Sequence, residues 1–307
     1  MIANFFNKSK PANAFNILIL LFLYYVTASF LIHNYEFSFV FLIKKMLFFF
    51  WLILFVLIVN FIIKKNSLTQ DNSYALLLIV FLGGTFSETM FSNSIVFSNI
   101  ALLLGFRKIY SLRSGIRTKQ KLFDAGFWVG ISAIIYPASL LYGGLIYVAI
   151  VVFKRLDLKN LVIPVIGLAT PTLIYFTYHY YFETLAVFNN KLTLEYSLDF
   201  NPYYQLKLLG PIAIVVVILL MAVFALTPKI ILVSNKFKSL WIVLLNHLVI
   251  SIVLVVLSPV KSGSEMLFLL FPAAIIITNL LQKSQSPIFK NVILYLFLSI
   301  SVCVYFL

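Results

Sequence analysis

The chain has 307 residues, of which 63% are hydrophobic and only 10% are charged. Soluble domains usually carry about 25% charged residues, and one core of this size cannot bury so much apolar surface. These values exclude a soluble globular protein and predict an integral membrane protein. The single cysteine, Cys303, excludes an internal disulfide and a cysteine-based zinc site.

The apolar segments predict an all-α, polytopic membrane protein. A helix that crosses the hydrocarbon needs about 20 apolar residues, with about 17 to 25 common. We therefore expect about eleven transmembrane helices (9–11) in a single transmembrane domain, residues 1–307. The first follows Lys8 and Lys10 and is long for a signal peptide, so we expect no cleavage. The expected segments are 14–33, 46–63, 74–90, 91–106, 123–136, 138–153, 161–182, 206–226, 239–258, 266–281 and 291–307.

The basic residues predict the orientation, because Lys and Arg accumulate in short cytoplasmic loops. With the amino terminus inside and the carboxyl terminus outside, 18 of the 23 basic residues lie inside. This distribution explains the net charge of +14 without a nucleic-acid partner, including the basic stretch 107–121. The five basic residues expected outside are Lys44, Lys45, Lys191, Lys207 and Lys261.

Two pairs of segments are short for a full crossing and return. The apolar run from Tyr74 ends at Gly83-Gly84, and the segments within 123–153 meet at Pro137 without a polar loop. Irregular backbone at membrane depth is tolerated only where protein buries it or water reaches it. We therefore expect two short hairpins lining an outward-facing cavity, with Glu88 and Tyr136 at its floor. The alternative is that both hairpins tilt and thin the bilayer locally.

Several polar residues lie in or beside apolar segments. Asn246 and His247 are near the middle of a predicted helix, where an ionisable residue is a functional candidate. Hydrogen bonding to a neighbouring helix is the structural alternative. His179 lies among tyrosines at an outer helix end, which indicates an interfacial belt or stacking on a sugar or lipid headgroup. Residues 183–205 predict an external amphipathic loop. No phosphate-binding loop, metal motif or cofactor motif is present.

Residues 123–138 (FDAGFWVGISAIIYPA) resemble a stretch common in GT-C-type glycosyltransferases. In that superfamily a basic cytoplasmic loop precedes a helix with a Gly-x-x-x-Gly-like step. A dipeptide that ends in proline follows, and then a short apolar helix that ends in basic residues, here Lys154-Arg155. Residues 258–273 are similar to a late segment in which a basic residue precedes an apolar run with a proline. The resemblance covers residues 75–280, and eleven helices fit the same architecture.

The resemblance implies transfer of a sugar from a polyprenyl-phosphate carrier at the outer face. Such chemistry needs a carboxylate base and cations for the departing phosphate. The resemblance implies Glu36 or Glu88 as the base and Lys261 as the phosphate partner. Further substrate-binding candidates are Lys44, Lys45, Tyr136 and His179. Neither the resemblance nor the sequence indicates a metal ion, a divalent cation included, or another cofactor.

Two other functions remain open. The first outer loop is short and carries a single acid, Glu36, as in a shortened or inactive relative of the superfamily. Such a protein would serve as a non-catalytic subunit or scaffold of an envelope assembly, with other membrane-protein subunits as partners. A transporter or lipid-handling protein is the third hypothesis. The chain also resembles a bacterial inner-membrane family of unassigned activity, which implies that location and contact with membrane lipids.

Overall fold

A computed structural model describes residues 2–31, 39–233 and 235–307. Within these ranges every regular element is helical, and eight helices are long and apolar enough to cross a membrane. The protein is therefore an all-α integral membrane protein, as the composition predicts. Each of the eleven predicted segments overlaps a helix in the described part of the chain. The number of helices that cross and their orientation stay predictions.

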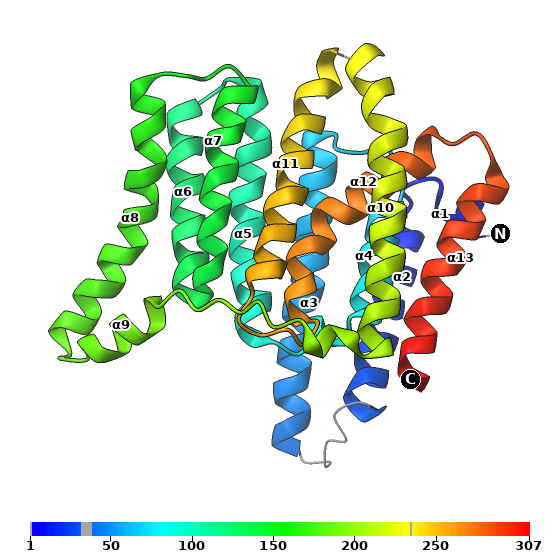
Figure 1. Ribbon diagram of the computed structural model, residues 1–307, viewed down its shortest axis with the longest axis horizontal. Helices are drawn as coiled ribbons and strands as arrows, with labels where there is room; N and C mark the ends of the chain where they lie inside the picture. The colour runs from blue at the N-terminus through cyan, green and yellow to red at the C-terminus, as the bar shows by residue number, and fades with distance from the viewer. Residues whose placement is uncertain (1, 32–38, 234) are drawn as a thin grey trace. The chain divides into compact units, whose positions relative to one another are not determined.

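The chain forms two compact units of helices (Figure 1). Unit 1 comprises residues 1–92, 200–229 and 261–307, and unit 2 comprises residues 93–199 and 230–260. Each unit is assembled from segments far apart in the sequence, so neither could be recognised as a continuous stretch. The expectation of one transmembrane domain stays a prediction.

Unit 1 is built around α4 (Tyr74–Thr85), whose residues are all buried. It packs against α2, α3, α12 and α13, which explains why it is apolar on every side. Its length is about 18 Å at 1.5 Å per residue, shorter than the roughly 30 Å hydrocarbon layer. The other elements of unit 1 are α1 (Ile2–Phe6), α2 (Pro11–Leu31), α3 (Phe39–Asn66), η1 (Ser87–Met90), η4 (Asn201–Tyr204), most of α10 (Leu206–Val233), η5 (Ser264–Met266), α12 (Leu267–Lys283), α13 (Pro287–Cys303) and η6 (Val304–Phe306).

The double glycine near the end of α4 permits close packing on α2. A Cβ atom at Gly84 would lie 2.8 Å from the ring of Tyr24, closer than real Cβ contacts. Tyr24 is itself fixed by a hydrogen bond to Ser301 and by stacking on Tyr305. The glycine pair, which in the sequence marks a short helix, is therefore also a packing feature of the unit 1 core.

Unit 2 is organised by α6 (Thr118–Ile135), which packs against α5 and α8. A Cβ at Gly126 would lie 2.2 Å from the carbonyl oxygen of Pro164, so only glycine permits this approach. Gly167 approaches the Phe123 carbonyl oxygen equally closely, as small residues do at membrane helix crossings. The elements of unit 2 are α5 (Asn93–Ser111), η2 (Leu112–Ser114), α6, η3 (Pro137–Tyr142), α7 (Gly143–Val152), α8 (Leu158–Tyr181), α9 (Leu185–Leu192) and α11 (Asn235–Leu257).

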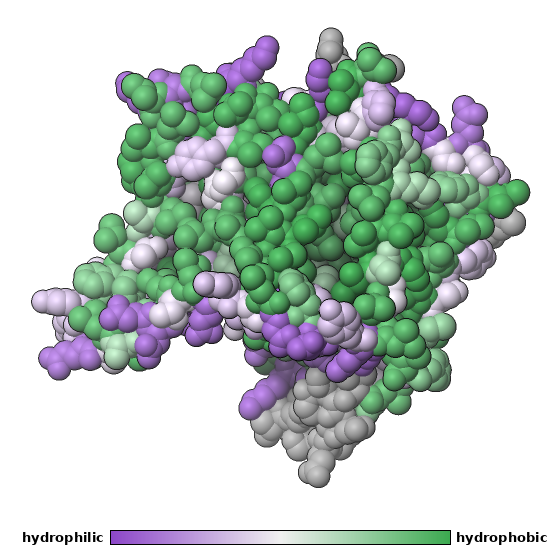
Figure 2. Space-filling model, viewed as in Figure 1, coloured by the Kyte–Doolittle hydropathy of each residue, from purple (hydrophilic) through white to green (hydrophobic). Residues whose placement is uncertain are grey.

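The surface of unit 2 is that of a protein in a bilayer. Hydrophobic side chains run along its helices and hydrophilic ones gather near the helix ends (Figure 2). Only 17% of the most apolar window of α8 is buried. The predicted external loop 183–205 contains the short helices α9 and η4, joined by an irregular segment.

Candidate functional site

A buried carboxylate lies at the start of η5 in unit 1. Glu265 is 0% exposed, and its two carboxylate oxygens accept hydrogen bonds from the Gly263 N–H at 3.1 and 3.0 Å. The Tyr203 hydroxyl donates a third hydrogen bond, at 2.5 Å, to Oε1. Gly263 has φ +94°, a left-handed conformation that favours glycine, and this turn aims its N–H at the carboxylate. Hydrogen bonds from a hydroxyl to a carboxylate are characteristically short, as the bond from Tyr203 is.

A buried cation lies beside this carboxylate. Lys261 is 5% exposed, and its Nζ lies 4.9 Å from the centre of the Phe200 ring and 5.8 Å from that of Tyr203. The ring faces attract an ammonium group, and Glu265 adds an electrostatic attraction. We call Phe200, Tyr203, Lys261, Gly263 and Glu265 the Lys261–Glu265 cluster. Each charge in it is in contact with protein groups that stabilise it.

The sequence singled out Lys261 but not Glu265. The signal was present, because Glu265 is the last acid of the chain and directly precedes the long apolar run of α12. Its contact with Tyr203 could not be read from the sequence, since 62 residues separate the two. A carboxylate at the edge of an apolar run is more informative than one inside a polar loop, because burial makes an unpaired charge costly.

Glu88 belongs to the same end of unit 1. It lies half-buried in η1, directly after α4, and η1 packs against η5. The predicted carboxylate Glu88 is therefore on an element, η1, that packs against η5. Glu265 lies on η5, and Lys261 shortly before it. Of the predicted site residues, unit 1 thus brings the segments of Glu88 and Lys261 close together.

The remaining unit 1 candidates lie on α3 or before it. The Nζ atom of Lys45 is 4.6 Å from the centre of the Phe91 ring, just beyond η1, and its carbonyl oxygen accepts a hydrogen bond from Tyr25. Lys44 is exposed. Glu36, the other predicted base, lies outside the described residues.

Tyr136 and His179 belong to unit 2. The Tyr136 hydroxyl is hydrogen-bonded to Ser258 at 2.7 Å, and His179 Nδ1 is hydrogen-bonded to Thr184 at 2.6 Å. The His179 ring also packs edge-on against Tyr175. An apolar cavity of about 390 Å³ begins next to Tyr136, lined by Pro137, Ala138, Leu140, Leu141, Leu194, Glu195, Tyr196 and Leu257. The expected outward-facing cavity with Glu88 and Tyr136 at its floor stays a prediction.

The polar pair inside α11 has structural partners in unit 2. His247 is 0% exposed, and its Nδ1 is hydrogen-bonded to the Tyr110 hydroxyl at 2.9 Å. Asn246 donates to the Ile242 carbonyl oxygen at 2.8 Å, within its own helix. The His247 bond, to Tyr110 of α5, is of the kind expected under the structural alternative, whereas the Asn246 bond does not reach a neighbouring helix. Among the described residues, no group of three or more His, Cys, Asp or Glu side chains could hold a metal ion.

Comparisons with known proteins place the chain in a family. Neither the curated proteins nor the solved structures contain a match. A family model does match, and it covers residues 7–307, almost the entire chain. The protein belongs to the family described as "Family of unknown function (DUF6427)".

Proposed function

We propose that this protein handles a polyprenyl-phosphate-linked sugar at the outer face of the bacterial inner membrane, as a GT-C-like protein. The observation that supports the proposal is the packing of η1, which carries Glu88, against η5, which follows Lys261 and carries Glu265. A carboxylate for proton transfer and a cation for a phosphate are thus supplied by adjacent segments of one unit. Phosphate recognition needs the cation, and activation of a hydroxyl needs the carboxylate.

The proposed reaction is a displacement at the anomeric carbon of the lipid-linked sugar. The Glu88 carboxylate accepts the proton of the acceptor hydroxyl, whose oxygen then bonds to the anomeric carbon. The bond from that carbon to the phosphate oxygen breaks, and the polyprenyl phosphate leaves with the bonding electrons. Lys261 stabilises the departing phosphate, and Glu265 and Gly263 hold the loop that carries Lys261. Glu36 is the alternative base.

This reaction requires that the lipid phosphate reach Lys261, which two aromatic rings cover. Phe200 and Tyr203 lie over the Lys261 ammonium, which is only 5% exposed. A lipid phosphate reaches Nζ when these rings move aside, and the phosphate then replaces the ring faces as the partner of the cation. We therefore expect Phe200→Ala to strengthen phosphate binding.

Binding of undecaprenyl phosphate to the full chain in lipid nanodiscs tests the proposal. Lys261→Met should weaken binding about tenfold, the effect of losing one charge-assisted hydrogen bond. Lys207→Met is the matched control, because Lys207 is a half-buried lysine of the same unit at the start of α10. A thermal unfolding curve for each variant separates loss of binding from loss of the fold. Equal binding by wild type and a folded Lys261→Met would overturn the phosphate role.

Turnover tests the base. Glu88→Gln should retain undecaprenyl phosphate binding and lower the consumption of an undecaprenyl-phosphate-linked hexose by about a hundredfold, the smaller effect expected for loss of a general base. Consumption is measured by mass spectrometry of the lipid fraction. Full turnover in Glu88→Gln would show that Glu88 is not the general base. Glu36 would then be the base, or the reaction would use no carboxylate base.

A second candidate function is a non-catalytic subunit of an envelope assembly. The exposed apolar face of α8 favours it, because Leu158, Leu173 and Ile174 are more than half exposed. Purification in mild detergent tests this candidate: a stoichiometric membrane-protein partner should copurify and be lost in Leu173→Trp. Recovery of the chain alone, together with sugar-lipid turnover, would exclude it.

A further inference from the structure

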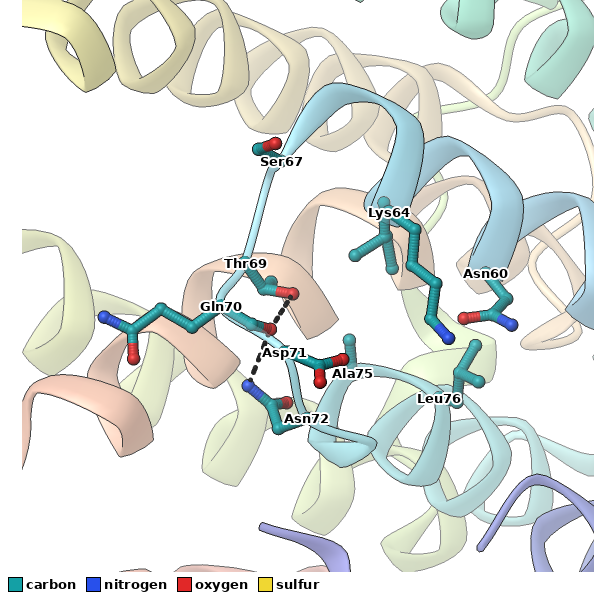
Figure 3. Close-up of a pocket in the computed structure, with 10 residues that line it drawn as sticks. Asn60, Lys64, Ser67, Thr69, Gln70, Asp71, Asn72, Ala75 and Leu76 are labelled. Carbon is teal, nitrogen blue, oxygen red and sulfur yellow. Dashed lines mark hydrogen bonds between the residues drawn. The ribbon is translucent and has the colours of Figure 1, made fainter. Parts of the chain in front are cut away.

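A polar pocket lies at the end of unit 1 opposite the Lys261–Glu265 cluster. It is formed where α3 ends and α4 begins, about 18 Å along α4 from η1. Its volume is about 330 Å³, within the range of about 300–1,000 Å³ for small-molecule sites. Figure 3 shows Asn60 and Lys64 extending from α3 into the space bordered by Asp71, on the loop before α4, and by Leu76 of α4. The proposed sugar-lipid site involves none of these residues.

The loop that forms one wall of this pocket is held in place by other helices. The Leu68 carbonyl oxygen accepts a hydrogen bond from Asn279 at 3.1 Å. The Gln70 N–H donates to Gln282 at 3.2 Å, and the Asn72 side chain accepts from the Tyr74 N–H at 3.0 Å. Asn279 and Gln282 belong to α12, so the loop is anchored to the core of unit 1. The pocket is therefore pre-formed.

The charged groups that line the pocket have opposite signs and, within the described part of the chain, no side-chain bonding partner. Lys64 and Asp71 both border it, yet among the described residues neither takes part in an ion pair or a side-chain hydrogen bond. Asn60, which lies one helical turn before Lys64, is equally without a bond in that part of the chain. A pocket of about 330 Å³ that is bordered by an ammonium and a carboxylate suits a ligand that carries both charges.

We propose that this pocket binds a phosphoethanolamine group, the headgroup of an aminophospholipid. Its phosphate would contact Lys64 and Asn60, and its primary ammonium would contact Asp71 and the Thr69 hydroxyl. A quaternary choline group fits less well, because such groups are recognised by aromatic cages. The ten described lining residues include no aromatic side chain.

The outer surface of α3 indicates that the headgroup belongs to a lipid. Leu57 and Phe61 are 49% and 44% exposed, and they precede Lys64 by two turns and by one turn of the same helix. Acyl chains can lie along this apolar surface while the headgroup occupies the pocket. Lys64 is placed where basic side chains meet lipid phosphates at the end of a membrane helix.

Native mass spectrometry of the full chain tests the proposal with three dioleoyl lipids, phosphatidylethanolamine, phosphatidylcholine and phosphatidylglycerol, and with free phosphoethanolamine. Wild type should bind phosphatidylethanolamine about fivefold more tightly than the other two lipids, the scale of one partly exposed ion pair. Asp71→Asn should abolish this preference, and Lys64→Met should weaken all three lipids. The matched controls are Lys65→Met and Asp157→Asn, which change exposed charges outside the pocket.

Each outcome decides the proposal. Equal binding of the three lipids by wild type, or a preference that persists in Asp71→Asn, would overturn it. Binding of free phosphoethanolamine as tight as that of the lipid would support the headgroup chemistry and assign a soluble ligand. Because undecaprenyl phosphate carries no amine and the Lys261–Glu265 cluster is unchanged in these variants, failure here leaves the proposed function standing.

Discussion

In unit 1, a pair of oppositely charged residues lies near each end of α4, and the two pairs differ in burial and in their contacts. At the end near η1, Lys261 and Glu265 are buried, and their charges are stabilised by ring faces, a hydroxyl and a peptide N–H. At the start of α4, Lys64 and Asp71 are exposed and border an open pocket. The first arrangement stabilises the fold and restricts access to its cation. The second leaves both charges available to a ligand.

The largest expected effect is on the buried carboxylate. Glu265→Leu removes the acceptor of the Tyr203 hydroxyl and of the Gly263 N–H and the electrostatic attraction between Glu265 and Lys261, and each unsatisfied buried group is costly. We expect the free energy of unfolding to fall by about 3 kcal/mol. Asp71→Leu, which removes the exposed carboxylate near the other end of α4, is the variant for comparison. A Glu265→Leu variant as stable as wild type in a denaturant titration would contradict the buried network.

Removal of the Tyr203 hydroxyl tests a single hydrogen bond of the Lys261–Glu265 cluster, the bond from Tyr203 to Glu265. Tyr203→Phe keeps the ring over Lys261 but removes the donor to Glu265, so we expect a loss of about 1.5 kcal/mol, the lower value for a hydrogen bond to a charged group. Tyr204→Phe, next to it and exposed, is the control. Identical unfolding midpoints for the two variants would show that the Tyr203 bond is not formed.

The glycine turn of the same cluster has a smaller expected effect. Gly263→Ala puts a Cβ on a residue with φ +94° and brings it to 3.0 Å from a methyl group of Leu208. A non-glycine residue in a left-handed conformation costs about 1 kcal/mol. Gly143→Ala is the control, since a Cβ there meets nothing within 4 Å. Thermal unfolding of the two variants measures the difference, and a stabilised Gly263→Ala would exclude the observed turn.

The smallest effect is expected at the open pocket. Lys64→Met and Asp71→Asn should change the unfolding free energy by less than about 0.5 kcal/mol, as for surface positions without partners. Their effect should appear in lipid binding instead. A loss of stability as large as that of Tyr203→Phe would show that these charges hold the fold together.

Part of the fold and of the candidate site is predictable from the sequence. Apolar length predicts the helices, because a membrane span imposes a minimum run, and the short run after Tyr74 correctly predicts the short α4. The charge count singled out Lys261 as a basic residue in a predicted outer loop. The Gly-x-x-x-Gly step of α6 contributes to the resemblance to glycosyltransferases, and the structure shows that its glycines let α6 approach α8 closely.

The remainder depends on contacts between distant residues. Tyr203 and Glu265, or Leu68 and Asn279, meet because separate helices of unit 1 pack together, and no local pattern encodes such a pairing. In the sequence, Lys64 is one of the basic residues expected on the cytoplasmic side. Because the membrane topology alone explains a basic residue there, the sequence does not indicate a binding role for it. That Lys64 and Asp71 border the same pocket emerges only when the walls of that pocket are known.

The most direct test of the contrast is a pair of double-mutant cycles measured by unfolding of the full chain in detergent. One cycle combines Lys261→Met with Glu265→Gln, and the other combines Lys64→Met with Asp71→Asn. We predict a coupling energy above about 0.5 kcal/mol for the buried pair and additivity within about 0.3–0.5 kcal/mol for the pocket pair. Equal coupling in the two cycles, or stronger coupling between Lys64 and Asp71, would contradict the distinction between a closed cluster and an open ligand site.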